Sequence, residues 1–345
     1  MFRMLWLLLT LTAVPALAAD VCPILRTQTG ASQAATRIAA FACEEHQLWH
    51  RPFIDADGRL AGSTVREAET GLLANGEQAW RRVAGYWRDS GLLGQAAGRP
   101  GAVECGYAAM GGPPSAGCRA FIVDAPWSAV FVSWVLRRAG LPGFAAAANH
   151  LAYVRGAYRG PEASAYRVAD PATARPALGD LLCHVRSNRQ IYGFGGLARL
   201  LSAGEAGLGM HCDIVVAVDP DRDGLAYLVG GNVLDGVTMR LLPLTGGGRF
   251  RDLPMRRLDA PACTPDAPAA CNANRQDWAV LLQLRPQQDL ARLTPPPSLP
   301  AATSPASPAM PAQPAGTPAG CCVHCVAGDT SVPRCPKGAS PGGDR

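Results

Sequence analysis

The chain has 345 residues, and its 32 basic and 27 acidic side chains give a net charge of +5. This charge is mild and is spread along the sequence without a basic tract, so we expect no nucleic-acid partner. A chain of this length can bury a full hydrophobic core, in one body or in two lobes.

The first residues have the three parts of an export signal. Arg3 precedes an apolar run over residues 5–14, and Pro15 separates that run from the small residues of Ala16-Leu17-Ala18. We therefore predict that residues 1–18 are a signal peptide. The run is shorter than the roughly 20 apolar residues of a spanning helix, so no membrane span is expected after cleavage. The predicted location is periplasmic or secreted.

Twelve cysteines in an exported chain predict disulfide bonds. Three pairs are suggested by their short enclosed loops or by their position near the N-terminus, although sequence alone does not fix connectivity. The three pairs are Cys105 with Cys118, Cys263 with Cys271, and Cys22 with Cys43. Cys183 is expected to be a buried thiol or a bridge.

A helical lobe is predicted over about residues 32–100. Apolar residues recur at helical spacing from Ile38 to Trp49 and from Trp80 to Trp87. Between them, Thr64-x-x-Glu67 matches a capping box and predicts another helix. His46 and His50 have a zinc-binding spacing, but they lack a third ligand, so they are interpreted as structural and we predict no metal and no cofactor.

A core is predicted over about residues 105–285, and it begins with a loop over 115–124. The helix that follows is capped by Asp124, has Pro126 in its first turn and ends at Gly140. Ser128 therefore lies in the first turn of this helix, at the positive end of its dipole.

Strand patterns dominate the chain after this helix. The segment 179–185 indicates a turn that enters a strand, and segments 211–218 and 225–232 predict a hairpin closed by the polar loop 219–224. Further strands are predicted over 237–244 and 278–284. Helices followed by antiparallel strands predict an α+β domain, which we place at residues 19–285.

The hairpin suggests a catalytic pair. In its simplest register Val218 opposes Leu225 and His211 opposes Asn232, so the imidazole and the carboxamide share one face of the sheet. Such an amide could fix the orientation of the imidazole, as the third member of a triad does. Ser128 is then the candidate nucleophile, because helix N-terminal N–H groups can stabilise an oxyanion.

Four segments in this order resemble the NlpC-type and CHAP-type cell-wall amidases and peptidases. They are Trp127-Ser128-Ala129-Val130-Phe131-Val132, Gly179-Asp180-Leu181-Leu182, His211-Cys212-Asp213-Ile214-Val215-Val216 and Gly230-Gly231-Asn232-Val233. The chain is most similar to the bacterial domain-of-unknown-function family 2272, a papain-like relative, from Ile38 to about Asn232 or as far as Leu284. The resemblance implies a papain-like fold that acts on amide bonds of peptidoglycan.

One departure from this resemblance leaves the activity open. The active peptidases carry Cys where this chain has Ser128, and a serine hydroxyl is a far weaker acid than a thiol. The chain could be a serine hydrolase on this scaffold or a catalytically inactive cell-wall binding or scaffold protein, or the helix register could be misassigned. In the hydrolase, Ser128, His211 and Asn232 are catalytic. The residues expected to contact substrate are Trp127, His150 and Asp213.

The C-terminal part has a different composition. Residues 286–320 are rich in Pro and Ala and predict a disordered tether. Residues 321–345 form a Cys-rich tail with cysteines at 321, 322, 325 and 335 and a histidine at 324. These residue types are suitable zinc ligands. In an oxidising compartment, however, we expect them to form disulfides or an intermolecular link. A protein partner could bind through this tail, beside the expected peptidoglycan partner.

Overall fold

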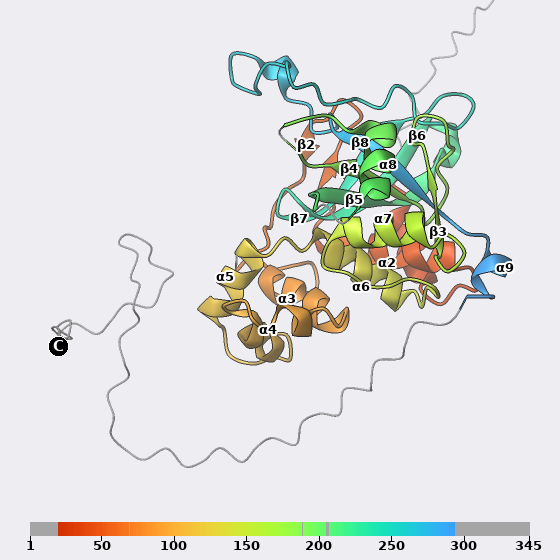
Figure 1. The fold of residues 1–345 in the computed structure, drawn as a ribbon. Coiled ribbons are helices and arrows are strands. Elements are labelled where there is room, and N and C mark those ends of the chain that lie inside the picture. The colour runs from red at the N-terminus through yellow and green to blue at the C-terminus, as the bar shows by residue number, and fades with distance from the viewer. Residues whose placement is uncertain (1–19, 69, 188, 205–206, 294–345) are drawn as a thin grey trace, which may run out of the picture. The chain divides into compact units, whose positions relative to one another are not determined.

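A computed structural model describes residues 20–68, 70–187, 189–204 and 207–293 of the chain (Figure 1). The predicted signal peptide, the tether from residue 294 onward and the Cys-rich tail lie outside the described residues. Within these ranges no single helix is both long and apolar enough to cross a membrane; only the bent pair of helices over 116–124 and 128–138 passes on length and composition.

Helices occupy the N-terminal half and recur between the strands. The α-helices are α1 (Cys22–Leu25), α2 (Ala34–Leu48), α3 (Ala79–Asp89), α4 (Ala102–Ala108), α5 (Ala116–Asp124), α6 (Ser128–Arg138), α7 (His150–Arg159), α8 (Gly193–Ala203) and α9 (Gln287–Leu290). Short 3₁₀ turns are η1 (Arg26–Gln28), η2 (Leu93–Ala96), η3 (Pro220–Arg222) and η4 (Pro268–Ala270).

The strands form one eight-stranded sheet with the order β2-β1-β7-β6-β5-β4-β8-β3. Their bounds are β1 (Phe53–Ile54), β2 (Leu60–Ala61), β3 (Tyr166–Ala169), β4 (Leu181–Val185), β5 (Met210–Val218), β6 (Leu225–Val233), β7 (Gly236–Pro243) and β8 (Asp277–Leu284). The α+β class is confirmed. The strands of the sheet are antiparallel except at one pair, because β1 pairs with β7 in parallel.

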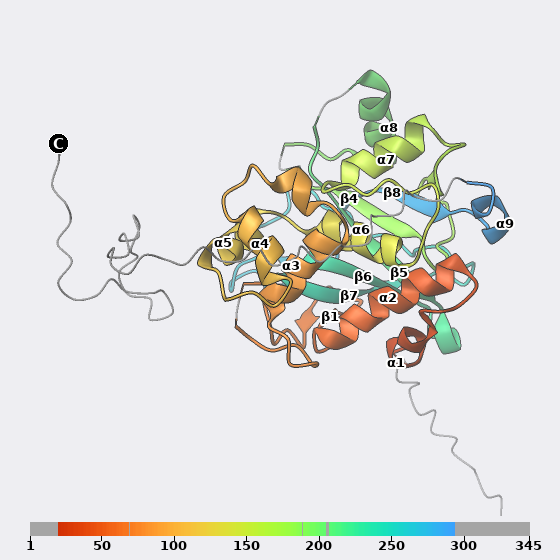
Figure 2. The ribbon, with the colours of Figure 1, turned by 90° about the horizontal axis from the view of Figure 1, so that it is seen from below.

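Alternation along the strands divides the buried residues between two cores. Helices α2 and α6 lie against β5, β6 and β7 (Figures 1 and 2), and Tyr227 and Val229 of β6 belong to the core on that side. Ala226 and Leu228, which alternate with them, belong to a second core that also contains Trp278. A period of two is the expected consequence of the strand pleat.

The predictions for the helical part were partly wrong. The helix with Trp80 and Trp87 is confirmed as α3, but the predicted loop over 115–124 is helix α5, capped by the Ser115 side chain. Asp124 ends α5 and does not cap α6, which begins at Ser128. The Thr64 capping box does not start a helix: residues 62–66 have no regular structure, and the Glu67 carboxylate accepts a hydrogen bond from the Trp127 indole.

The hairpin prediction is confirmed in its middle and fails at both ends. Ile214 pairs with Val229 in the predicted register, but a bulge sets Val218 opposite Ala226. At the other end the β5–β6 ladder stops at the Ile214–Val229 pair, so within the described residues His211 has a strand partner only on its other side, at His184 of β4. Asn232 has a positive φ of 55°, which turns it out of the regular strand, so the register does not carry it to His211.

Four disulfides connect the described residues. The three predicted pairs are confirmed, and the fourth joins Cys183 of β4 to Cys212 of β5. Four bridges fit an oxidising extracellular or periplasmic location.

Residues 286–293, which the composition assigned to the tether, belong to the folded body. They include α9, in which Leu290 is buried, and the Gln287 side chain accepts a hydrogen bond from the Ala34 backbone at 2.8 Å.

Candidate active site

Ser128 occupies the first position of α6, as the sequence predicted. Ala125, Pro126 and Trp127 separate α5 from α6, and the backbone of Trp127 provides the non-helical N-cap. The N–H groups of the first turn, including those of Ser128 and Ala129, have no intrahelical acceptor, and the helix dipole adds positive potential there. An oxyanion that formed beside Ser128 would therefore meet donors fixed by the fold.

Ser128 is hydrogen-bonded to the imidazole of His150. The distance from Ser128 Oγ to His150 Nε2 is 2.7 Å, and His150 Nδ1 is hydrogen-bonded to the Tyr153 hydroxyl. His150 is the first residue of α7, whose N-cap is Asn149, and Tyr153 follows three positions later on the same helix face. If Ser128 donates to Nε2, then Nδ1 carries its proton and donates to the Tyr153 oxygen.

His211 lies beside His150 with both ring nitrogens already engaged. Their ring centroids are 5.3 Å apart. His211 Nε2 is 2.8 Å from Asp213 Oδ1, and His211 Nδ1 is 3.2 Å from a guanidinium nitrogen of Arg186. Because arginine only donates, Nδ1 is the acceptor and Nε2 carries the proton that it shares with Asp213. His211 is thus held as one neutral tautomer.

The predicted triad must therefore be corrected in two of its contacts. Ser128 is hydrogen-bonded to His150 and not to the predicted His211. His150 was expected to contact substrate. The group that orients His211 is Asp213, which was also expected to contact substrate, and not Asn232. The error lies in the assumed partners, since Ser128, His150, His211 and Asp213 do converge in one buried cluster.

Asp213 connects this cluster to a second cation. Its other carboxylate oxygen is 3.0 Å from Arg240 Nε, and Arg240 also donates to the Asn274 side chain at 2.7 Å. Burial by itself would raise the pKa of Asp213, but His211 and Arg240 outweigh it and hold the pKa of this carboxyl well below its usual range. Asp213 is therefore a fixed negative charge.

A third histidine, His184, extends the cluster along the sheet. Its ring centroid is 5.2 Å from that of His211 and 5.2 Å from that of Trp278. Burial, followed by the neighbouring His211, holds the pKa of both His150 and His184 well below the usual value, and the Arg186 charge adds to this effect. The three imidazoles are thus neutral near pH 7, and His150 can accept a proton.

Asn232 supports the start of α6 from a different side. With its amide oriented to satisfy both groups, its oxygen accepts from the Trp127 backbone N–H at 3.2 Å and its nitrogen donates to Glu67 at 3.3 Å. Glu67 also accepts a hydrogen bond from the Trp127 indole. Burial raises the pKa of Glu67 to about 7, although the indole donor lowers it, and Asp235 raises it further.

The two residues before Asn232, Gly230 and Gly231, lie where any side chain would collide with a neighbour. A Cβ on Gly230 would lie 1.9 Å from Asp213 Oδ1, and one on Gly231 would lie 2.4 Å from the Phe131 side chain on α6. Both distances are far below van der Waals contact. The two glycines therefore let the Asp213 carboxylate and the nucleophile helix approach the end of β6 closely.

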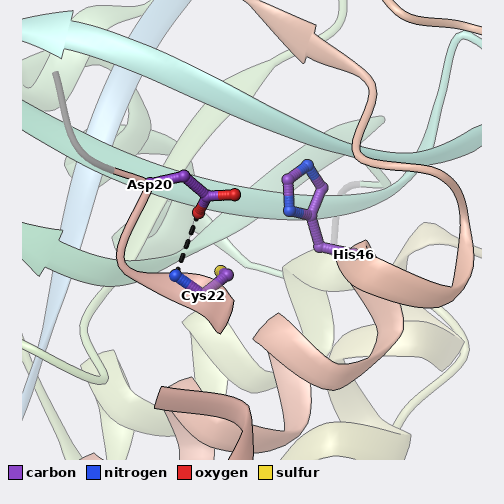
Figure 3. Close-up of side chains that lie close together, drawn as sticks. All are labelled: Asp20, Cys22 and His46. Carbon is purple, nitrogen blue, oxygen red and sulfur yellow. Dashed lines mark hydrogen bonds between the residues drawn. The ribbon is translucent and has the colours of Figure 1, made fainter. Parts of the chain in front are cut away.

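One group of metal-ligand residues occurs in the described part of the chain, at Asp20, Cys22 and His46 (Figure 3). Cys22 is in a disulfide with Cys43 and offers no thiolate. Asp20 accepts the Cys22 backbone N–H at 2.9 Å and pairs with Arg51, and His46 Nε2 is 3.0 Å from the Pro52 carbonyl. These contacts attach the N-terminal residues to α2 and to the segment that follows it, and they occupy groups that would otherwise be free to bind a metal.

The model of one protein family matches residues 74–284. It is the domain-of-unknown-function family 2272, described as an uncharacterized protein conserved in bacteria. This span is more than half of the chain. The chain belongs to family 2272. No curated protein and no solved structure matches it.

Several residues of the site in this family 2272 protein were missed by sequence reasoning, among them Arg240 and the three that follow. Tyr153 could have been found, because it lies three positions after His150 on a helix with a capping asparagine. Glu67 was misread as part of a capping box, and Arg186 carries no local signal, since its contact to His211 depends on the pairing of β4 with β5.

Proposed function

We propose that the protein is an exported hydrolase that cleaves amide bonds in cell-wall peptides. The observation that carries the proposal is the 2.7 Å contact between Ser128 Oγ, at the N-terminus of α6, and His150 Nε2. A nucleophile bonded to a base, with that base bonded in turn to an orienting group, is the arrangement that nucleophilic acyl transfer requires.

In the proposed reaction Ser128 Oγ attacks the amide carbonyl and its proton passes to His150 Nε2. The negative oxygen of the tetrahedral intermediate faces the free N–H groups of the first turn of α6. His150 then returns the proton to the leaving amine as the C–N bond breaks. A water molecule releases the acyl group by the same steps, and Ser128 regains its proton.

The remaining side chains position the reacting pair. Tyr153 fixes the His150 tautomer. Burial, followed by the neighbouring Tyr166 and Asp213, raises the pKa of Tyr153 well above its usual value, so its phenol stays neutral. His211, fixed by Asp213 and Arg186, packs against the His150 ring and limits its rotation.

The substrate class rests on the resemblance to cell-wall amidases and on the disulfides. The helix that starts at Ser128 packs on the antiparallel strands β5 and β6, which carry His211 and Asn232 as in the resemblance, whereas the proposed base His150 lies on α7. Four disulfides suit the compartment in which peptidoglycan is found.

The second candidate function is that of a catalytically inactive cell-wall binding protein. The observation that favours it is burial, since Ser128 is only 4% exposed and His150 only 3%. A substrate carbonyl must reach Ser128 Oγ, so catalysis requires the covering residues to open. A retained scaffold without turnover would not need this opening.

The test is to incubate the purified protein with peptidoglycan and measure newly released amino groups. We expect release by the wild type, loss in Ser128→Ala and in His150→Gln, and normal release by Ser202→Ala, whose hydroxyl is exposed on α8. No release by the wild type, together with binding of peptidoglycan by both serine variants, would establish the inactive alternative. Thiol labelling of Ser128→Cys reports separately whether reagents reach the site.

A further inference from the structure

Arg186 brings an arginine side chain with spare donors into the cluster. It follows the end of β4 two residues after His184, so the two side chains leave the strand on the same side. The residue as a whole is exposed, yet its guanidinium reaches the buried His211 at 3.2 Å. That contact uses one donor out of five.

The positive charge of Arg186 has no dedicated counter-ion. Within residues 20–293, as far as they are described, no carboxylate lies within ion-pair distance of its guanidinium. The nearest acid in the cluster, Asp213, is already bonded to His211 and Arg240. The other neighbours of Arg186 are neutral imidazoles. Its positive charge contributes to the lowered pKa of His150 and of His184.

A second observation also points to a missing ligand group. His184 is 97% buried, since 3% of it is exposed, and its Nδ1 atom has no hydrogen-bond partner. A buried polar atom without a partner costs free energy. The Arg186 guanidinium, which has no ion-pair partner among the described residues, and the His184 Nδ1 atom belong to side chains on one side of β4, and an anion with oxygen acceptors would pair with such groups.

We propose that Arg186 is a specificity-determining residue that binds a carboxylate of the substrate beside the bond to be cleaved. This inference rests on the hydrolase function proposed above and narrows its substrates to amides that lie next to a free carboxylate. The planar guanidinium fork matches a carboxylate in two parallel hydrogen bonds. The carboxylate is either the C-terminus of the peptide or an acidic side chain next to the scissile amide.

Binding of the carboxylate also affects the base. The Arg186 charge disfavours protonation of His150, and a bound anion would offset that charge. The pKa of His150 would then rise from its lowered value, which strengthens it as the acceptor of the Ser128 proton. Anionic substrates should thus gain in kcat as well as in binding.

The test uses the full-length Ser128→Ala variant, which binds without cleaving, and calorimetric titration with two pairs of synthetic peptides. In the first pair, two alanine tetrapeptides differ only in the C-terminus, which is a carboxylate in one and a carboxamide in the other. In the second pair, both peptides end in a carboxamide, and one contains Glu where the other contains Gln. We expect one anionic member to bind at least about tenfold more tightly than its neutral counterpart. The pair that shows the difference identifies the source of the carboxylate.

Further variants assign that preference to Arg186. Adding Arg186→Gln should abolish it, Arg186→Lys should retain part of it, and Arg189→Gln, an exposed arginine three residues away, should leave it unchanged. Equal Kd values within both pairs, or a preference that survives Arg186→Gln in a folded variant, would overturn the proposal. A carboxylate preference in a wild-type protein that releases no amine would instead refute only the hydrolase function.

Discussion

His150 and His211 lie side by side, yet their ring nitrogens have different roles. His211 is bonded on one side to Asp213 and on the other to Arg186, so it has no free position for a substrate proton. His150 contacts Ser128 through Nε2, and only the Tyr153 hydroxyl occupies its other nitrogen. The tyrosine therefore takes the orienting role that an amide or carboxylate takes in other triads.

Removal of the Tyr153 hydroxyl tests this role. Tyr153→Phe keeps the ring packed against His150 but leaves Nδ1 without a partner, so the imidazole can adopt the wrong tautomer. We expect kcat to fall on the order of tenfold, less than the 10²–10⁴ contributed by a general base itself, with KM nearly unchanged. Steady-state release of amino groups measures both constants. Tyr158→Phe, whose hydroxyl bonds Ser202 at 2.6 Å away from the cluster, is the matched control, and an equal loss there would argue against an orienting role.

The lowered pKa of His150 sets a pH dependence for the reaction. A general base works when it is deprotonated, and burial, His211 and the Arg186 charge hold its pKa well below 6.5. The value of kcat/KM should therefore rise with pH along an acid limb whose midpoint lies below 6.5, and stay level through neutrality. In Arg186→Gln the same limb should move to higher pH, because a positive charge has been removed. A limb centred above 6.5 in the wild type would exclude His150 as the base.

At the scale of elements, the α6 N-terminus is held by a network that local sequence patterns do not reveal. The Trp127 indole and the Asn232 amide both reach Glu67, a residue of the segment before α3. The positions of Ser128 at a helix start and of His211 in a hairpin strand were predictable, because helix caps and turn residues are local. The partners were not, since they depend on where α7 packs and on the positive φ at Asn232 that ends the regular ladder.

Glu67 makes this network sensitive to pH. Its pKa is raised from 4.5 to about 7 by burial and by Asp235, against the indole hydrogen bond. A carboxyl with a raised pKa in the folded state contributes stability below its unfolded pKa, and loses it as the pH rises towards the folded value. Glu67→Gln should therefore lack the part of the fall in unfolding free energy that the wild type shows between pH 4.5 and 7. Urea unfolding at pH 5 and pH 8 measures this difference, with Glu104→Gln, on the exposed surface of α4, as the control for lost charge.

At the scale of the whole molecule, the disulfides combine stability with the construction of the site. Short enclosed loops allowed two pairs to be anticipated, and the position of Cys22 and Cys43 near the N-terminus a third. Cys183–Cys212 required the pairing of β4 with β5, which are separated in sequence by α8. This fourth bridge lies directly beside His184 and His211, the residues that follow and precede its cysteines. It cross-links β4 and β5 on one face, and His184 and His211 project from the other face of the same two strands.

Replacement of this bridge should therefore affect both stability and activity. The Cys183→Ala/Cys212→Ala variant loses a cross-link between cysteines 29 residues apart, which the chain-entropy relation places at about 3–4 kcal/mol of unfolding free energy. Its kcat should fall as well, because β4 and β5 can shift and His211 then loses its fixed place beside His150. The matched control is Cys263→Ala/Cys271→Ala, which removes a bridge over eight residues outside the cluster. That variant should lose somewhat less stability and keep its kcat and its carboxylate preference, as judged by chemical unfolding and peptide assays on both proteins. Equal kcat in the two double variants would show that the Cys183–Cys212 bridge stabilises the sheet without positioning the histidines.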